Sequence, residues 1–335
     1  MRVGYICDGG GSIGWGHIGR GRALLEAAEA GSALVVGSGR SEVASWLAQR
    51  APGILVAPWD TPEQPCDPPS CPYDALVIDH YSLSQEWICG AIGHRPVLVV
   101  DDWLRVNVEA TGLINPNLGA DRADYPAARV EQWMLGASYA LLRREVRASR
   151  ATLGRDVVPH IVLTFGGSDP AGHTAAAANT LTEASWYRNG GRLTVVLGMS
   201  YRGSTPWTAW DGQRSERTEV LHQPADFIDR CRSADIVVCG ASTTTYEVAS
   251  LGRPFLPVAL VPNQERVTAA WAEQGIGEAL SVRQTNWTHS MRTSVEALLA
   301  DEHRRHEAVR TGSALVDGRG VERVLAACAT ALAAR

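Results

Sequence analysis

Short apolar runs recur along the first half of the chain, separated by segments whose apolar residues have helical spacing. Strands are expected at Val3–Cys7, Leu34–Gly37, Ile54–Ala57, Ala75–Asp79, Val97–Val100 and Gly112–Asn115. Helices are expected between them at Ile18–Ala30, Ser41–Gln49 and Ser84–Ile92. Because these strands are apolar throughout and alternate with helices, the pattern predicts a parallel sheet covered on both faces.

The second half of the chain repeats this alternation. Strands are expected at Ile161–Phe165, Leu193–Leu197, Thr218–His222, Ile236–Cys239 and Phe255–Ala259, and helices at Thr174–Ala184, Ala225–Arg232, Thr244–Ser250, Arg266–Gln274 and through the tail from Trp287 to Arg335. The segment Leu141–Pro159 is rich in arginine and poor in core residues, so we place a domain junction there. The expected fold is α/β, with two Rossmann-like domains (1–150, and 151–335 with the helical tail) that face each other across a cleft.

Composition narrows the possible partners. The 335 residues carry a net charge of −5 and no long basic cluster, which argues against nucleic acid as a partner. No run approaches the ~18 apolar residues of a membrane span, and no signal peptide is evident, so we expect a cytoplasmic protein. The seven cysteines are scattered, which favours reduced thiols over a metal site, and we expect no metal.

All 31 basic residues are arginine, because the sequence contains no lysine. This excludes a Schiff-base lysine, a Walker-type phosphate loop and the strand lysine of protein kinases. A diphosphate would then be bound mainly by glycine-rich turns and the N–H groups of helix N-termini. We expect no cofactor.

Polar or glycine-rich clusters follow several of the expected strands. They are Asp8-Gly9-Gly10-Gly11, Asp79-His80-Tyr81, Asp101-Asp102, Gly166-Gly167-Ser168-Asp169 and Gly240-Ala241-Ser242-Thr243. Each could be only a turn, since glycine serves wherever the backbone needs a positive φ. Ligands of doubly wound sheets bind at the carboxyl ends of the strands, so together these clusters predict a ligand site.

The first loop contains a dinucleotide-type pattern, Gly14-Trp15-Gly16-His17-Ile18-Gly19. A nicotinamide site is disfavoured, because Gly14 comes seven residues after Cys7 and no acidic residue follows the second strand. The notable side chain is His17, at the first turn of a helix behind a glycine-rich loop.

Each polar candidate also has a purely structural interpretation. His17 could bond to its own turn, and Asp79 and Asp101 could cap the loops that follow them. Tyr81 could pack at the rim of the sheet. Glu247 could be solvated, although one turn inside a helix it could also reach ribose hydroxyls.

As a set, these motifs resemble a known family. Ile13-Gly14-Trp15-Gly16-His17-Ile18-Gly19-Arg20 and Val77-Ile78-Asp79-His80-Tyr81 are similar to motifs of the UDP-2,4-diacetamido-2,4,6-trideoxy-β-L-altropyranose hydrolases of pseudaminic acid biosynthesis. The similarity continues through Asp101-Asp102, Asn115-Pro116-Asn117, Ser138–Arg143, Phe165–Pro170, Ala241–Glu247 and Asn263-Gln264-Glu265, over roughly residues 1 to 280. The later motifs also resemble nucleotide-sugar glycosyltransferases. The segments Pro58–Pro72 and Tyr201–Glu216 match nothing in the family.

The resemblance implies a type B glycosyltransferase fold and assigns roles to residues. The expected catalytic residues are His17 as the catalytic histidine, Tyr81 near the reacting carbon, and Asn263 on the side of the sugar. The resemblance also places Gly14, Gly16 and Asp79 in the sugar-side motifs. In the second domain, the residues that match UDP- or sugar-binding positions are Gly166, Gly167, Ser242 and Thr243 for the diphosphate, Glu247 for ribose, Phe227 and Ile228 near uracil, and Asn263 and Gln264 facing the sugar.

These assignments lead to the hypothesis of a hydrolase that inverts a UDP-linked amino or deoxy sugar at its anomeric carbon. His17 would activate water, and UDP and free sugar would be the products. One alternative is a glycosyltransferase that moves a sugar from UDP or dTDP to a small acceptor. Another is a protein that binds nucleotide sugars without turnover.

Overall fold

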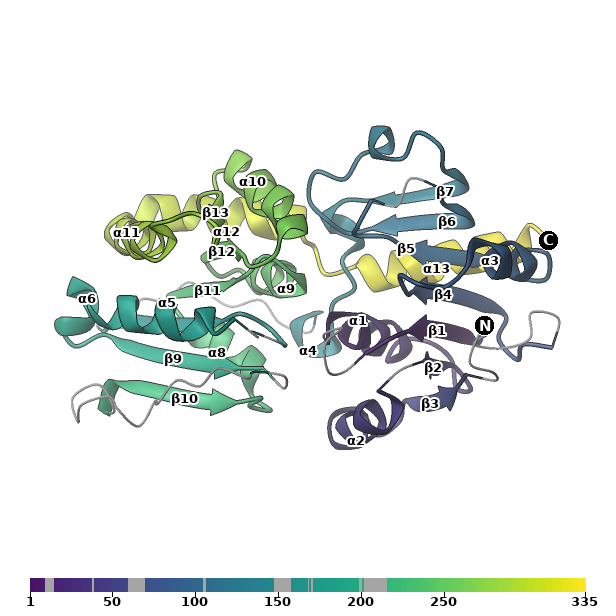
Figure 1. Cartoon of the computed structure of the whole chain (residues 1–335), viewed down its shortest axis with the longest axis horizontal. Helices are drawn as coiled ribbons and strands as arrows, with labels where there is room; N and C mark the ends of the chain where they lie inside the picture. Colours follow the sequence, from purple (N-terminus) through teal and green to yellow (C-terminus); the bar gives the residue numbers. More distant parts are fainter. Residues whose placement is uncertain are drawn as a thin grey trace. The chain divides into compact units, whose positions relative to one another are not determined.

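The structure is a computed structural model that describes residues 1–9, 15–37, 39–59, 70–104, 107–147, 158–167, 169, 171–198, 201 and 216–335. The chain divides into two compact units, Met1–Arg144 with Gly318–Arg335, and Glu145–Asp317. Each unit is built on one parallel sheet with helices packed against it (Figure 1). The expected α/β fold with two Rossmann-like domains is confirmed.

The sheet of the first unit has seven parallel strands in the order β3-β2-β1-β4-β5-β6-β7. The strands are β1 (Val3–Cys7), β2 (Ala33–Val36), β3 (Leu55–Pro58), β4 (Ala75–Asp79), β5 (Val97–Val100), β6 (Glu109–Asn115) and β7 (Arg129–Leu135). Helices α1 (Gly16–Leu25), α2 (Arg40–Arg50) and α3 (Gln85–Ile92) follow β1, β2 and β4, and two short 3-10 turns lie at Arg122–Asp124 and Ala137–Tyr139.

Both faces of this sheet are buried, as its apolar strands require. Successive strand residues alternate between two hydrophobic clusters, so Tyr5 packs in the cluster of α1 and Ile6 in the cluster of α3. Most strand residues therefore contribute to one of two cores, whereas the edge strand β7 is mostly partly buried or exposed. The polar residues Asp79 and Asn115 occupy the last positions of β4 and β6.

The second unit has six parallel strands in the order β10-β9-β8-β11-β12-β13. They are β8 (His160–Thr164), β9 (Arg192–Leu197), β10 (Thr218–His222), β11 (Ile236–Gly240), β12 (Phe255–Ala259) and β13 (Leu280–Ser281). The helices are α4 (Arg144–Arg147, which begins at the unit boundary), α5 (His173–Thr182), α6 (Ser185–Arg188), α8 (Phe227–Ser233), α9 (Thr243–Leu251), α10 (Glu265–Glu273), α11 (Trp287–Ala300) and α12 (Glu302–Leu315), and Pro262–Gln264 forms a 3-10 turn. Helices α5 and α11 pack together on this sheet, and α9 packs against α12.

The end of the chain belongs to the first unit, in contrast to the expectation that the whole tail accompanies residues 151–335. Val321, Val324 and Cys328 of α13 (Gly320–Ala333) lie in the same cluster as α1. A Cβ on Gly320 would lie 2.2 Å from the Ala140 carbonyl oxygen, so only glycine permits this approach. Sequence periodicity identifies a helix but not the sheet on which it packs.

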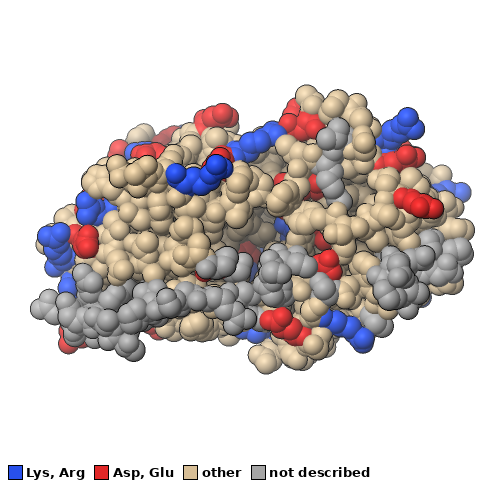
Figure 2. Space-filling model, viewed as in Figure 1, with Lys and Arg blue, Asp and Glu red and all other residues tan. Residues whose placement is uncertain are grey.

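Surface charge and helix length are the two properties that bear on the partners considered above. Acidic and basic side chains are interspersed on the face drawn in Figure 2. Among the described residues, no helix is long and apolar enough to cross a membrane.

Candidate functional site

Asp79 is the centre of a buried polar cluster at the carboxyl end of the first sheet. It is the last residue of β4 and lies in register with Cys7 of β1. Its Oδ2 accepts hydrogen bonds from the Tyr5 hydroxyl at 2.6 Å and from Arg20 Nε at 2.8 Å. Its Oδ1 accepts from Arg20 Nη2 at 3.0 Å and lies 2.7 Å from His17 Nδ1. Asp79 therefore holds the side chains of α1 rather than capping its own loop.

The charge of Asp79 is stabilised by its partners. Complete burial alone would raise the pKa of its carboxyl, but Arg20 and His17 outweigh burial and hold that pKa well below the ordinary value. Arg20 also lies 3.2 Å from Asp102 Oδ2, so its guanidinium joins two carboxylates, and its own pKa is raised despite burial. Asp79 is therefore ionised throughout the physiological pH range.

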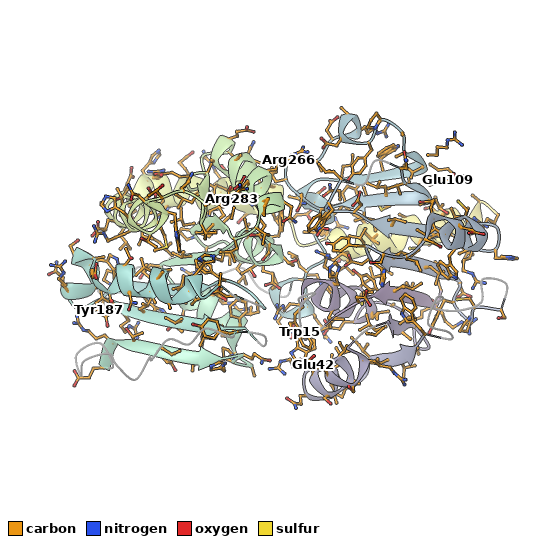
Figure 3. All side chains as sticks on the ribbon, in the orientation of Figure 1. Trp15, Glu42, Glu109, Tyr187, Arg266 and Arg283 are labelled. Atoms are coloured by element: carbon orange, nitrogen blue, oxygen red, sulfur yellow. The ribbon has the colours of Figure 1, made fainter. Side chains whose placement is uncertain are left out.

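His17 is the second residue of α1, which begins at Gly16. The Trp15 ring, labelled in Figure 3, packs on Trp46 of α2 with centroids 5.4 Å apart and fixes the start of this helix. A Cβ on Gly16 would meet no atom of the described residues within 4 Å. The expected Gly14 lies outside the described residues.

The tautomer of His17 follows from its acidic neighbour. An ionised carboxylate can only accept, so Nδ1 carries the proton, and the 3.1 Å contact of Arg20 with Nδ1 is not a hydrogen bond. In the neutral ring, Nε2 then keeps its lone pair. The described residues offer no hydrogen bond to Nε2. The buried histidine is thus oriented as a proton acceptor.

Tyr81 lies two residues beyond Asp79 and packs against His17. Its ring meets the His17 ring nearly edge-on, with centroids 4.9 Å apart and an interplanar angle of 79°. Its hydroxyl donates to Asp102 Oδ1 at 2.6 Å. Burial and the Asp102 charge raise the pKa of Tyr81 well above its ordinary value, so the phenol stays protonated.

The glycine turn after β8 makes a close backbone contact in the second unit. Gly166 has a φ of +83°, a conformation that glycine adopts without strain. A Cβ on Gly198, just after β9, would lie 2.0 Å from the Gly166 oxygen and 2.5 Å from the Gly167 carbonyl carbon. Asp169 caps α5 by accepting from the His173 and Thr174 N–H groups. The N-terminus of α5 is therefore partly occupied by the protein itself.

The second predicted phosphate turn lies on the neighbouring strand. Ser242 immediately precedes α9, whose first residue is Thr243, and β11 pairs directly with β8. The Ser242 side chain makes no capping hydrogen bond, unlike Asp169 at α5. Glu247, one turn further, is 3% exposed, so its interpretation as a solvated side chain is wrong.

The remaining expected binding residues follow β12 and β10. Asn263 and Gln264 form the 3-10 turn before α10. Gln264 Oε1 accepts from the Leu260 N–H at 2.9 Å, and the buried Asn263 Oδ1 has no hydrogen-bond partner among the described residues. Phe227 and Ile228 begin α8, which contacts β8 and α9. Because β8, β11 and β12 are parallel neighbours in the sheet, the turns that follow them lie side by side at the carboxyl end of the sheet.

Sequence patterns alone do not single out several contributors to the cluster around His17. They are Tyr5, Arg20, the Asp102 carboxylate as a partner of Tyr81, and Trp103. The i to i+3 spacing of His17 and Arg20 is the available signal, because it places both on one helix face. Tyr5 carries no such signal, since it looks like any buried strand residue. In the described part of the chain, no group of three potential metal ligands occurs.

Comparison with known proteins supports the fold. No known protein-family profile matches the sequence. The chain is 24% identical over 199 residues to the spore coat polysaccharide biosynthesis protein SpsG of Bacillus subtilis (strain 168), a match that spans 57% of this chain and 56% of that protein. MurG of Acinetobacter baumannii is structurally similar, with a TM-score of 0.63 and 13% identity over 98% of this chain and 100% of that one.

A second solved structure has a similar fold. The spinosyn rhamnosyltransferase SpnG, solved with thymidine diphosphate, has a TM-score of 0.61 and 13% identity over 97% of this chain and 99% of that one. The chain therefore has the type B glycosyltransferase fold.

Proposed function

We propose that the chain is a nucleotide-sugar hydrolase that cleaves the anomeric C1–O bond of a UDP-linked amino or deoxy sugar with inversion. The observation that carries this proposal is the His17–Asp79 pair, in which Asp79 holds the proton on Nδ1, so that Nε2 of the neutral ring can accept a proton. The names of the relatives add support for the substrate class. They include a polysaccharide biosynthesis protein and a rhamnosyltransferase solved with thymidine diphosphate.

In the proposed reaction, His17 Nε2 takes a proton from water while the water oxygen forms a bond to C1. The C1–O bond to the diphosphate breaks, and its electron pair leaves with UDP. Asp79 stabilises the imidazolium that forms, as a buried carboxylate beside a histidine does in hydrolases. Because UDP leaves as a stabilised anion, one base suffices and no metal takes part in any step.

The nucleotide is assigned to the second unit. Backbone N–H groups near Gly166, Gly167, Ser242 and Thr243 bind the diphosphate, and the partial positive charge at the start of α9 stabilises its growing charge. Glu247 binds ribose hydroxyls. The remaining expected contacts are Phe227 and Ile228 with the base, and Asn263 and Gln264 with the sugar.

A type B glycosyltransferase is the second candidate function, favoured by the glycosyltransferase names among the structural neighbours. The same base would then deprotonate an acceptor hydroxyl or amine. The two functions differ in one observable property, which is the release of UDP and free sugar without acceptor. Hydrolysis predicts stoichiometric release of both, whereas transfer predicts release only after acceptor is added.

The donor is identified first by thermal shift with UDP, dTDP, GDP and CMP. A ligand that binds only the folded chain raises the melting temperature by mass action. We expect the largest rise with UDP. Tight UDP binding without cleavage of any nucleotide sugar, with or without acceptor, would instead indicate a binding protein.

A further inference from the structure

Two exposed aromatic side chains adjoin the proposed base. Tyr81, which is 37% exposed, contacts the His17 ring with its own ring, and the centroids of the Trp103 and Tyr81 rings lie 5.6 Å apart. Trp103 is 58% exposed. An exposed apolar surface thus continues directly from His17, and surfaces of this kind at a polar site mark ligand contacts.

The loop that presents Trp103 is fixed by specific interactions. The Trp103 N–H donates to Asp101 Oδ1 at 3.2 Å, and the Asp101 carbonyl accepts from the Tyr125 hydroxyl at 2.8 Å. Leu104, the next residue, has a φ of +59°, which is unfavourable for a bulky side chain. Such strained backbone is concentrated at functional sites. The fold thus maintains an unfavourable backbone to hold a tryptophan in solvent.

Tyr81 is fixed as well. Its hydroxyl is bound to Asp102, which Arg20 also contacts, so the orientation of the ring is set by the same cluster that sets His17. The hydroxyl is therefore engaged within the protein, and the ring is the part of Tyr81 that a ligand meets. Both rings are preorganised, which lowers the entropy cost of binding.

We propose that Tyr81 and Trp103 form an aromatic subsite on which the C–H face of the substrate's pyranose ring stacks. This inference rests on the proposed function. A pyranose has polar hydroxyls at its edge and C–H groups on its faces, and those C–H groups match the negative face of an aromatic ring. The subsite selects the sugar and positions C1 near His17, while the nucleotide contributes no contact to it.

The test compares nucleotide with nucleotide sugar. Dissociation constants are measured by calorimetry for UDP, UDP-glucose and UDP-N-acetylglucosamine, with the wild-type chain, Trp103→Ala, Trp103→Phe and the control Leu55→Ala. Leu55 is 57% exposed in the same unit and lies on β3, so it matches the loss of exposed apolar surface. The quantity of interest is the ratio of the dissociation constant for UDP to the dissociation constant for the UDP-sugar. This ratio isolates the contribution of the sugar to binding.

We expect Trp103→Ala to lower this ratio about three- to tenfold for at least one sugar nucleotide and to leave UDP binding unchanged. Trp103→Phe should retain most of the ratio, and Leu55→Ala should retain all of it. Saturation of aromatic protons in NMR should transfer to the sugar ring protons with the wild type and markedly less with Trp103→Ala.

An unchanged ratio in Trp103→Ala, or an equal loss for UDP and UDP-sugars, would overturn the aromatic subsite. A wild-type chain that binds neither UDP nor a UDP-sugar would instead overturn the proposed donor. The two failures are distinguishable because the first needs intact UDP binding in the wild type. Since Trp103 is exposed, the melting temperature of its variants should remain unchanged, which separates loss of contact from loss of folding.

Discussion

His17 Nδ1 lies 2.7 Å from Asp79 Oδ1, although the two residues are 62 positions apart in the chain. The pair forms because α1 begins close to the end of β1, and β4 is the strand next to β1 in the sheet. Arg20, one turn after His17, closes the cluster by bonding both oxygens of the same carboxylate. The orientation of His17 therefore depends on a buried charge network rather than on its own helix.

Asp79→Asn should impair activity and stability together. It removes the charge that fixes the His17 tautomer, so we expect turnover to fall about 10²- to 10⁴-fold. It also leaves Arg20 buried without its main counter-charge, which costs about 3–5 kcal/mol of unfolding free energy. Turnover is measured by UDP release and stability by urea unfolding.

Asp74→Asn provides the matched control for that change. Asp74 pairs with Arg2 at 3.4 Å, and both side chains are substantially exposed. An exposed pair contributes about 0–1 kcal/mol, so its loss should affect neither turnover nor stability appreciably. Equal effects of Asp74→Asn and Asp79→Asn would contradict the role given to the buried cluster.

The stability of the chain should decrease at acid pH through Asp79. Its pKa is lowered by folding, so below the unfolded value near ~3.9 the unfolded chain binds a proton that the folded chain excludes. The stabilisation from Asp79 is therefore complete above about pH 5 and is lost progressively as the pH falls below about 4. Urea unfolding from pH ~6 to ~3 should show a steeper decline for the wild type than for Asp79→Asn. Parallel curves would contradict this linkage.

Tyr81→Phe should have a small effect. The Tyr81 hydroxyl donates to Asp102 and has a raised pKa, so it does not accept the proton of water. We expect turnover to fall less than about tenfold, because only one hydrogen bond of ~1 kcal/mol is lost. Tyr81→Ala, which also removes the ring beside His17, should lose more. A loss in Tyr81→Phe as large as in a His17 variant would give the phenol a catalytic role.

Gly198→Ala should weaken nucleotide binding by displacing the predicted phosphate turn after β8, although Gly198 itself lies outside that turn. The new methyl group would overlap the backbone at Gly166 and Gly167 and displace that turn. We expect a loss of about 1–3 kcal/mol in stability and weaker UDP binding by calorimetry. Gly53→Ala, where a Cβ would meet no atom within 4 Å, is the control and should bind UDP normally. Normal UDP binding by Gly198→Ala would argue against the turn after β8 as a phosphate site.

Much of the fold could be predicted from the sequence, because fully buried parallel strands are continuous apolar runs. Val3–Cys7, Ala75–Asp79 and Val97–Val100 have the predicted bounds. The edge strand β7 was missed, since most of its residues are only partly buried or exposed and its sequence is correspondingly mixed. The last helix was assigned to the wrong unit, because burial on a particular sheet is a tertiary property that periodicity does not contain.

The candidate site was predictable only in part. His17, Asp79 and Tyr81 were singled out by their places at strand ends and a helix start, and they do meet in one cluster. The partner of each side chain was not predictable. The interpretation that Asp101 caps its loop is confirmed by its bond to the Trp103 N–H, whereas the same interpretation of Asp79 is wrong. Local sequence is alike in the two cases, and only the neighbouring strand and helix distinguish them.

The most direct test of the central claim is the rate of UDP release by His17→Ala and His17→Asn, measured without acceptor beside the wild type. The account predicts a loss of about 10²- to 10⁴-fold in turnover with nucleotide-sugar binding largely retained, because a base acts in the transition state rather than in binding. Unchanged turnover in His17→Ala would contradict it.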